Sequence, residues 1–176
     1  MIPETCMADL DLTTLHARCS LSPALVGALV EAASVVMAAH HAAPPTPMRW
    51  VEDEIDRPAR IIWTAPDERA IASHSNNKDA TEDAACAVAI AAMHELGFRV
   101  VKRAFHGSGA DYLMVRNGEP ENDFLKLEVS GIFQGGGLLK RLRVKIDQVG
   151  GGQLNRPGRA VVVQFEEPAI AIGRWV

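Results

Sequence analysis

Glu128 is a carboxylate in the middle of an otherwise apolar segment. The alternation over residues 126–130 predicts a β-strand, in which side chains two positions apart share a face. Glu128 would then lie on one face with Lys126 and Ser130, and the residues between them would point to the apolar side. Because a buried carboxylate is costly without a partner, this position predicts either a functional site or a structural ion pair with Lys126 or Lys145.

Asp111 supplies a second carboxylate, on the strand predicted to precede that of Glu128. It follows the turn at residues 107–109, whose two glycines leave room for a backbone to approach closely. Mg²⁺ prefers oxygen ligands and usually keeps several waters. A bound divalent ion polarises a phosphodiester and lowers the pKa of a bound water, which becomes the nucleophile. Two carboxylates on neighbouring strands therefore predict a site for Mg²⁺ or Mn²⁺.

The elements that would position these carboxylates follow one another from residue 79 onwards. Residues 79–82 have the spacing of a capping box, with a short polar residue three positions before Glu82. The apolar run that follows predicts a helix buried on most sides, ended by Gly97. Strands are predicted over residues 98–105, 110–115, 124–132 and 159–166, a basic amphipathic helix over 138–149, and one further strand in the apolar tail to residue 176.

The N-terminal part, residues 1–75, is expected to form an extension to this core. Ser22 followed by Pro23 predicts a helix start, and the prolines from residue 44 stop a helix that spans about residues 22–42. A short hairpin is predicted from strands at residues 48–51 and 59–64, whereas residues 1–20 and 65–79 show no clean period.

The 22–42 helix is nearly apolar all round and needs a partner surface, either the core or a second subunit. It could therefore join the chain to a protein partner or into a homo-oligomer. Glu31 near its middle and the two histidines at its end make it too polar for a comfortable membrane span. No basic stretch precedes an apolar one at the start of the chain, so we expect neither an export signal nor a membrane location.

The order helix, strand, strand, strand, helix, strand resembles the PD-(D/E)xK nuclease superfamily. The resemblance rests on Glu82 in the first helix, on Asp111 in the second strand and on Glu128-Val129-Ser130 in the third. Residues 107–112 with 127–131 are also similar to a set of small bacterial proteins that share that core. The resemblance covers about residues 79–166 and leaves residues 1–75 out.

What the resemblance implies is a restriction-endonuclease-like αβββαβ core within residues 79–176, with a central mixed sheet flanked by helices. In such a core Asp111 and Glu128 would ligate Mg²⁺, the Val129 carbonyl would add a ligand, and Glu82 would complete the acidic cluster. The chain departs from the pattern at Ser130, where the superfamily has a lysine that orients the water and offsets phosphate charge. A hydroxyl cannot supply that charge.

Lys145 on the following helix is the best replacement for that lysine, because in some superfamily members the lysine migrates to this helix. Gln148, one turn further on the same face, could position a phosphate or a water, and Lys126 is a second candidate lysine. Each acidic residue also has a structural interpretation. Glu82 could act only as a helix cap, Asp111 as a turn residue, and Glu128 in a salt bridge.

The totals fit a soluble globular protein, and the order of the predicted elements favours the α/β class. The chain has 176 residues and a net charge of -4, which argues against indiscriminate coating of nucleic acid. Residues 99–145 nevertheless hold nine basic and five acidic residues, so this segment could attract phosphate. The widely spaced cysteines form no CxxC pair, and they indicate reduced thiols in the cytoplasm. They are Cys6, Cys19 and Cys86.

The sequence thus predicts a Mg²⁺-dependent nuclease-like protein that acts on DNA or RNA phosphodiesters, in a defence or repair system. Its candidate catalytic residues are Glu82, Asp111, Glu128, Lys145 and Gln148. The alternative is a catalytically silent member of the same fold that serves as a binding or assembly module, which the serine at position 130 favours. A third interpretation is a homo-oligomeric structural protein organised by the 22–42 helix.

Overall fold

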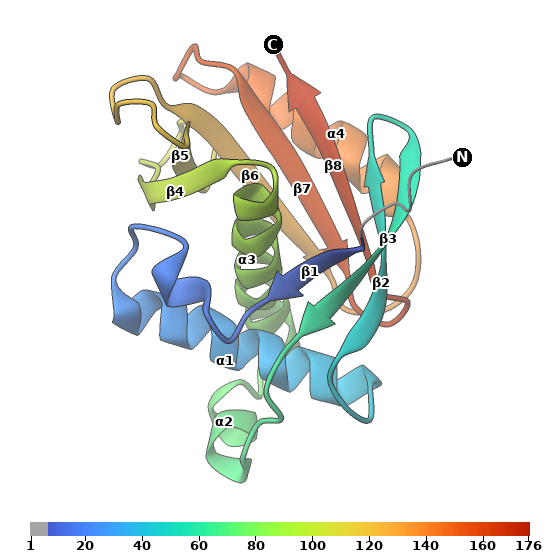
Figure 1. Ribbon diagram of the computed structural model, residues 1–176. Coiled ribbons are helices and arrows are strands. Elements are labelled where there is room, and N and C mark those ends of the chain that lie inside the picture. Colours follow the sequence, from blue (N-terminus) through green and yellow to red (C-terminus); the bar gives the residue numbers. More distant parts are fainter. Residues whose placement is uncertain (1–6) are drawn as a thin grey trace, which may run out of the picture.

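The computed structural model describes residues 7–176, which form a curled mixed β-sheet with helices on both of its faces (Figure 1). The helices are α1 (Pro23–His40), α2 (Glu68–Ser73), α3 (Asn77–Glu95) and α4 (Leu138–Gly151), with a short 3-10 helix at Leu15–Ala17. The strands are β1 (Ala8–Asp11), β2 (Thr46–Glu52), β3 (Ile55–Ile62), β4 (Phe98–Arg103), β5 (Tyr112–Arg116), β6 (Leu125–Ile132), β7 (Gly158–Gln164) and β8 (Ala169–Trp175).

All eight strands belong to one sheet, in the order β1-β3-β2-β8-β7-β6-β5-β4. The pairs β1–β3, β2–β8 and β6–β7 are parallel and the other neighbours are antiparallel. This mixed sheet confirms the α/β class that the sequence predicts. The predicted boundary near residues 75–79 falls between α2 and α3, and strands from both sides of it join through the β2–β8 pair.

β7 shows how the sheet carries a different helix on each face. Val161 and Val163 belong to the large core that contains α3 and α1. Ala160 and Val162 belong to a second core formed with Leu138, Leu142 and Val149 of α4. Alternate residues of a strand point to opposite faces, so an unbroken apolar run in this strand serves both layers.

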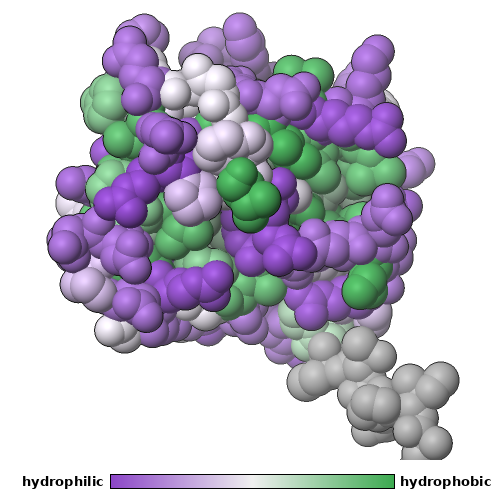
Figure 2. All heavy atoms as spheres, turned by 90° about the horizontal axis from the view of Figure 1, so that it is seen from above, coloured by the Kyte–Doolittle hydropathy of each residue, from purple (hydrophilic) through white to green (hydrophobic). Residues whose placement is uncertain are grey.

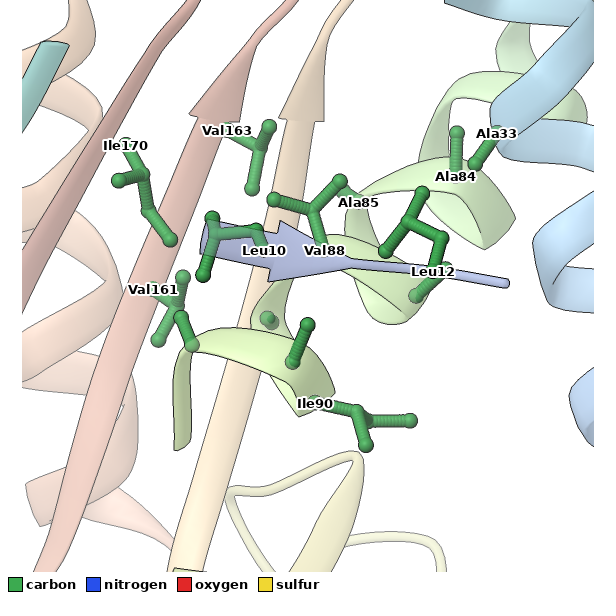
Figure 3. Close-up of a cluster of buried hydrophobic side chains, with 14 of the residues drawn as sticks. Leu10, Leu12, Ala33, Ala84, Ala85, Val88, Ile90, Val161, Val163 and Ile170 are labelled. Carbon is green, nitrogen blue, oxygen red and sulfur yellow. The ribbon is translucent and has the colours of Figure 1, made fainter. Parts of the chain in front are cut away.

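α3 lies inside the curve of the sheet, where β1 and β7 approach it from different parts of the chain (Figure 1). Figure 3 shows Leu10 of β1 beside Val161 of β7 and Val88 of α3. The alanines of α3 let α1 pack closely, with Ala33 next to Ala84. α3 is buried on most sides, as the sequence predicts. A helix in such a position has no single apolar stripe, and the alanine-rich sequence of α3 shows none.

The start of α3 differs from the prediction. Asn76 is the N-cap, and its side chain accepts hydrogen bonds from the amides of Lys78 and Asp79. The helix therefore begins before the predicted capping box, and Glu82 lies inside it rather than at its cap. Asn is as good a cap as Asp, so the earlier polar residue caps the helix and leaves the Glu82 carboxylate free for another contact.

Two further elements lie where the sequence shows no clear pattern. β1 pairs with β3 at one edge of the sheet, and α2 is capped by Asp67, which accepts from the amide of Ala70 at 2.8 Å. Both are short, so their periodicity is weak. α1 begins as predicted, with Ser22 as N-cap and Pro23 in the first turn.

By length and composition α1 is long and apolar enough to cross a membrane. Its buried residues pack against α3, an arrangement consistent with a soluble protein, and the cytoplasmic location stays a prediction. Cys19 and Cys86 are free thiols, whereas Cys6 lies outside the described residues.

Candidate functional site

An open cleft of about 900 Å³ lies between α3, the loop from β4 to β5, the middle of β6 and the C-terminal half of α4. The five residues proposed from the sequence as catalytic come from four different elements. The structure brings all of them to the lining of this one cleft. They are Glu82, Asp111, Glu128, Lys145 and Gln148.

The cleft exists because β5 stops pairing with β6 halfway along that strand. The ladder ends at Tyr112 and Leu127, followed by one bond from the Asp111 amide to the Leu127 carbonyl at 2.9 Å. Further along β6, the amides of Val129 and Gly131 point toward the space that β5 leaves open. Backbone amides of a sheet edge need other partners there.

Two of the predicted carboxylates supply these partners. Asp111 Oδ2 accepts from the Val129 amide at 2.8 Å, and Glu82 Oε2 accepts from the Gly131 amide at 3.1 Å. The other oxygen of Glu82 accepts no further hydrogen bond within residues 7–176, whereas the Asp111 carboxylate also lies close to that of Glu128. Gly131 allows this approach, since a Cβ there would lie 2.5 Å from the carbonyl oxygen of Thr81 on α3.

The loop from β4 to β5 is held against the end of α4, which fixes the position of Asp111. The Gln153 amide donates to the Gly107 carbonyl at 3.0 Å. Gly109 has a φ of +77°, and a Cβ there would lie 2.8 Å from the Gln148 carbonyl oxygen and the Gly152 Cα. The glycine turn recognised in the sequence therefore serves a close contact with α4.

The polar face of β6 is the one predicted, and it points to α4. Glu128 is only 3% exposed, and its Oε1 accepts from Lys145 Nζ at 2.7 Å. Lys145 also donates to Gln148 Oε1 at 3.2 Å, one helical turn away. The lysine expected on this helix therefore lies at the cleft and pairs with the acidic residue of β6.

The pKa of Glu128 is raised above its ordinary value. Burial is the main cause, and the negative charge of nearby Asp111 adds to it, while the hydrogen bond and charge of Lys145 act in the opposite direction. The two carboxylates are thus close enough to repel each other. Added positive charge near Asp111 and Glu128 would relieve this repulsion.

Lys126, the other candidate lysine, does not reach the cleft. Its side chain is fully buried, and its ammonium donates to the backbone carbonyls of Val149 and Leu154, the latter at 2.7 Å. It also lies 5.1 Å from the ring centroid of Trp175, and burial lowers its pKa. The sequence-based role for Lys126 is therefore wrong, because this lysine joins the end of α4 to β6.

Ser130 has a cation beside it even though it replaces a lysine. Arg141 of α4 donates to the Gly131 carbonyl at 2.9 Å, and its Nη1 lies 3.4 Å from the Ser130 hydroxyl oxygen. The sequence predicted a basic amphipathic helix here and did not single out Arg141. Since Arg141 and Lys145 are one turn apart, both face β6.

The donor atoms suit a hard cation only in part. Among the described residues, no group of three or more His, Cys, Asp or Glu side chains could hold a metal ion. The donors that remain are the Asp111 and Glu128 carboxylates and the Val129 carbonyl. The amide and the carbonyl of Val129 both point to the open edge of β6. Mg²⁺ is commonly bound by one or two carboxylates with waters and substrate phosphates completing its shell, so these three donors would supply part of a Mg²⁺ coordination shell.

Several cleft residues were not proposed as site residues from the sequence. Arg103 at the end of β4 and Phe105 in the following loop line the cleft with Asp83 of α3. Tyr112 and His106 line it as well. Their position just before and after the glycine turn was the available signal.

Comparison with protein-family models, with curated proteins and with solved structures finds no significant match for this chain. The fold and the cleft therefore define it as a mixed α/β protein with an acidic site served by a lysine from α4.

Proposed function

We propose that this protein is a Mg²⁺-dependent nuclease-like enzyme with a restriction-endonuclease-like core of the PD-(D/E)xK type. The observation that carries the proposal is the Glu128 carboxylate, buried at the cleft with Asp111 beside it and Lys145 bonded to it at 2.7 Å. Metal-assisted cleavage of a phosphodiester needs carboxylates that hold the ion, with a cation nearby, and this cluster contains both kinds of side chain.

The order of elements supports the same proposal. From α3 onwards the chain runs helix, three strands, helix, strand. β4, β5 and β6 form an antiparallel meander, and α4 connects β6 to its parallel neighbour β7. α3 and α4 cover opposite faces. This order of elements agrees with the αβββαβ order that the resemblance implies, and it supports the proposal.

Asp111, Glu128 and the Val129 carbonyl would hold Mg²⁺ or Mn²⁺. When bound, the ion would polarise the scissile phosphate and lower the pKa of a water. Lys145 carries the charge that Ser130 cannot supply, and it would interact with a phosphate oxygen while Gln148 orients the attacking water. Glu82 keeps the Gly131 edge of β6 in place and adds negative charge beside the metal ligands.

A silent binding or assembly module is the second candidate, and a specific observation favours it. Each of the three acidic side chains already has a partner within the protein: the Val129 amide for Asp111, the Gly131 amide for Glu82 and Lys145 for Glu128. These contacts could serve the fold alone. Assembly through α1 into a homo-oligomer stays a prediction, and light scattering of the purified chain would test it.

The deciding experiment compares wild type with Asp111→Asn and Glu128→Gln, and with Glu119→Gln as a matched control on an exposed loop residue. Labelled DNA and RNA, single- and double-stranded, are incubated with Mg²⁺, Mn²⁺ or EDTA, and Mg²⁺ binding is measured by calorimetry. We expect metal-dependent cleavage that is lost in both site variants and retained in the control. A wild-type protein that neither binds Mg²⁺ nor cleaves would leave the binding module as the remaining candidate.

A further inference from the structure

The cleft extends beyond the acidic residues to the end of β4, where Arg103, Phe105 and Tyr112 line it. We propose that this extension binds one unpaired nucleotide of a single-stranded nucleic acid, with its base on Phe105 and its phosphate on Arg103 and Tyr112. We refer to these three residues as the nucleotide arm. The inference deepens the proposed function, because it specifies the substrate class of the same cleft.

Tyr112 provides a buried polar group that needs an external acceptor. The residue is 1% exposed, and its hydroxyl has no hydrogen-bond partner within the described part of the chain. Its polar neighbours are the Cys86 thiol and the Arg103 guanidinium, and neither forms a well-aligned hydrogen bond with the hydroxyl. A thiol is a weak partner, and a guanidinium has donors only. A phosphate oxygen would accept from both the tyrosine hydroxyl and Arg103.

Arg103 supplies the positive charge. Its side chain is exposed at the cleft, its guanidinium carbon lies 5.7 Å from the centroid of the Tyr112 ring, and it forms no salt bridge with any residue from 7 to 176. Asp83 lies nearby and acts on it electrostatically. A guanidinium without a carboxylate partner matches the geometry of phosphate oxygens.

Phe105 indicates that the bound strand is unpaired. It is 54% exposed, and it is the one aromatic among the large hydrophobic side chains that the structure shows as exposed. An exposed ring at a cleft offers a face for base stacking, which is sequence-tolerant. Bases within a duplex are already stacked on each other, so they cannot use this face without unwinding.

The charge distribution also favours a single strand over a duplex. The net charge is -4, and the cations of the cleft are few and local, whereas duplex-binding domains usually carry a broad basic surface. Figure 2 shows one face of the molecule, where hydrophilic side chains surround small separate hydrophobic patches.

The test measures binding without metal, so that cleavage does not contribute. A fluorescein-labelled twelve-nucleotide oligothymidylate and a blunt duplex of similar length are titrated in EDTA, and anisotropy is followed. The variants are Arg103→Ala, Phe105→Ala and Tyr112→Phe. Arg116→Ala is the matched control, because Arg116 is exposed on β5 outside the cleft and contacts Phe98. Tyr112→Phe removes an unpartnered hydroxyl, so we expect it to fold as well as wild type.

We expect the single strand to bind more tightly than the duplex, and each nucleotide-arm variant to weaken single-strand binding by about fivefold or more. Arg103→Ala should also reduce the slope of log affinity against log salt by about 0.7, as loss of one phosphate contact requires. Tyr112→Phe should weaken binding without changing that slope. A purely structural role would not separate the two variants in this way.

Unchanged single-strand affinity in Arg103→Ala and Tyr112→Phe would overturn the inference, as would tighter binding of the duplex with the same dependence on Arg103. These outcomes are distinct from failure of the proposed function. If the protein cleaves with Mg²⁺ but its single-strand affinity does not depend on Arg103, it has the activity and lacks the subsite. One that binds single strands through Arg103 yet never cleaves keeps the subsite and lacks the activity.

Discussion

Glu128→Gln tests the electrostatics of the cleft most directly. Because burial and Asp111 raise the pKa of Glu128, the folded protein binds this proton more tightly than the unfolded chain does. The associated stability is fully present below the unfolded-state pKa of about 4.3 and is lost as pH rises through the folded-state pKa. Glutamine does not titrate. The free energy of unfolding of Glu128→Gln minus that of wild type should therefore increase with pH across this window.

The size of the effect has an upper bound and an opposing contribution. One titrating group changes stability by at most about 1.4 kcal/mol per pH unit within its window. Against this, the substitution removes the charge partner of Lys145. The Lys145 side chain is 22% exposed and keeps its hydrogen bond to Gln148, and a glutamine oxygen can still accept from it. At low pH, where Glu128 is protonated in both states, the two proteins should agree to within about 1 kcal/mol.

Urea denaturation in EDTA at a series of pH values between 4 and 8 measures this difference, with Glu119→Gln as the control. A difference that stays constant, or that becomes smaller as pH rises, would refute the reasoning. Addition of Mg²⁺ provides a separate reading for the proposed function. At about 100 times the dissociation constant, Mg²⁺ should stabilise wild type by about 2.7 kcal/mol, and Glu128→Gln should lose most of this gain.

Three other substitutions follow from the geometry, each measured by urea denaturation at pH 7. Gly109→Ala should lower the free energy of unfolding by about 2–4 kcal/mol, because of its positive φ and of overlap with α4. Gly118→Ala is the control: Gly118 has a φ of +89° and no atom within 4 Å, so its substitution should lower the stability by only about 1–2 kcal/mol. Equal losses in the two variants would contradict the role of the contact with α4. Lys126→Ala should destabilise the protein by about 2–5 kcal/mol, since it leaves a cavity and two carbonyls without their donor. Lys126→Met should destabilise it less, because the methionine fills the space. A larger loss of stability in Lys126→Met than in Lys126→Ala would argue against this explanation. Thr46→Val should cost about 1–3 kcal/mol, because the buried Trp63 indole donates to the Thr46 hydroxyl at 3.0 Å; an unchanged stability would mean that this bond contributes nothing.

Much of the core could be predicted from local patterns. The alternation over residues 126–130 identified both the strand and its polar face, because the two-residue period of a strand is a local property. Prolines and glycines marked the ends of α1 and α3 for the same reason. Elements with little periodicity were missed: β1 and α2 are four and six residues long, and their place depends on partners elsewhere in the chain.

The candidate site shows where local pattern stops being informative. Lys145 was the preferred lysine for Glu128 and Lys126 the second candidate, although Lys126 shares the face of Glu128 on β6. Only packing decided between them, because the end of α4 covers Lys126 and turns it toward backbone carbonyls. The contribution of Arg103 and Tyr112 was equally hidden, since the sequence does not say that β4 and α3 meet at the same cleft.

By itself, the sequence determined the α/β class, the order of elements from α3 onwards and the face of β6 on which Glu128 lies. Tertiary structure alone decided that β5 ends early beside β6, so that Asp111 and Glu82 bind exposed amides at the edge of a cleft. The physical reason is that backbone periodicity sets which way a side chain points, whereas the position at which two strands part depends on loops and helices distant in the chain.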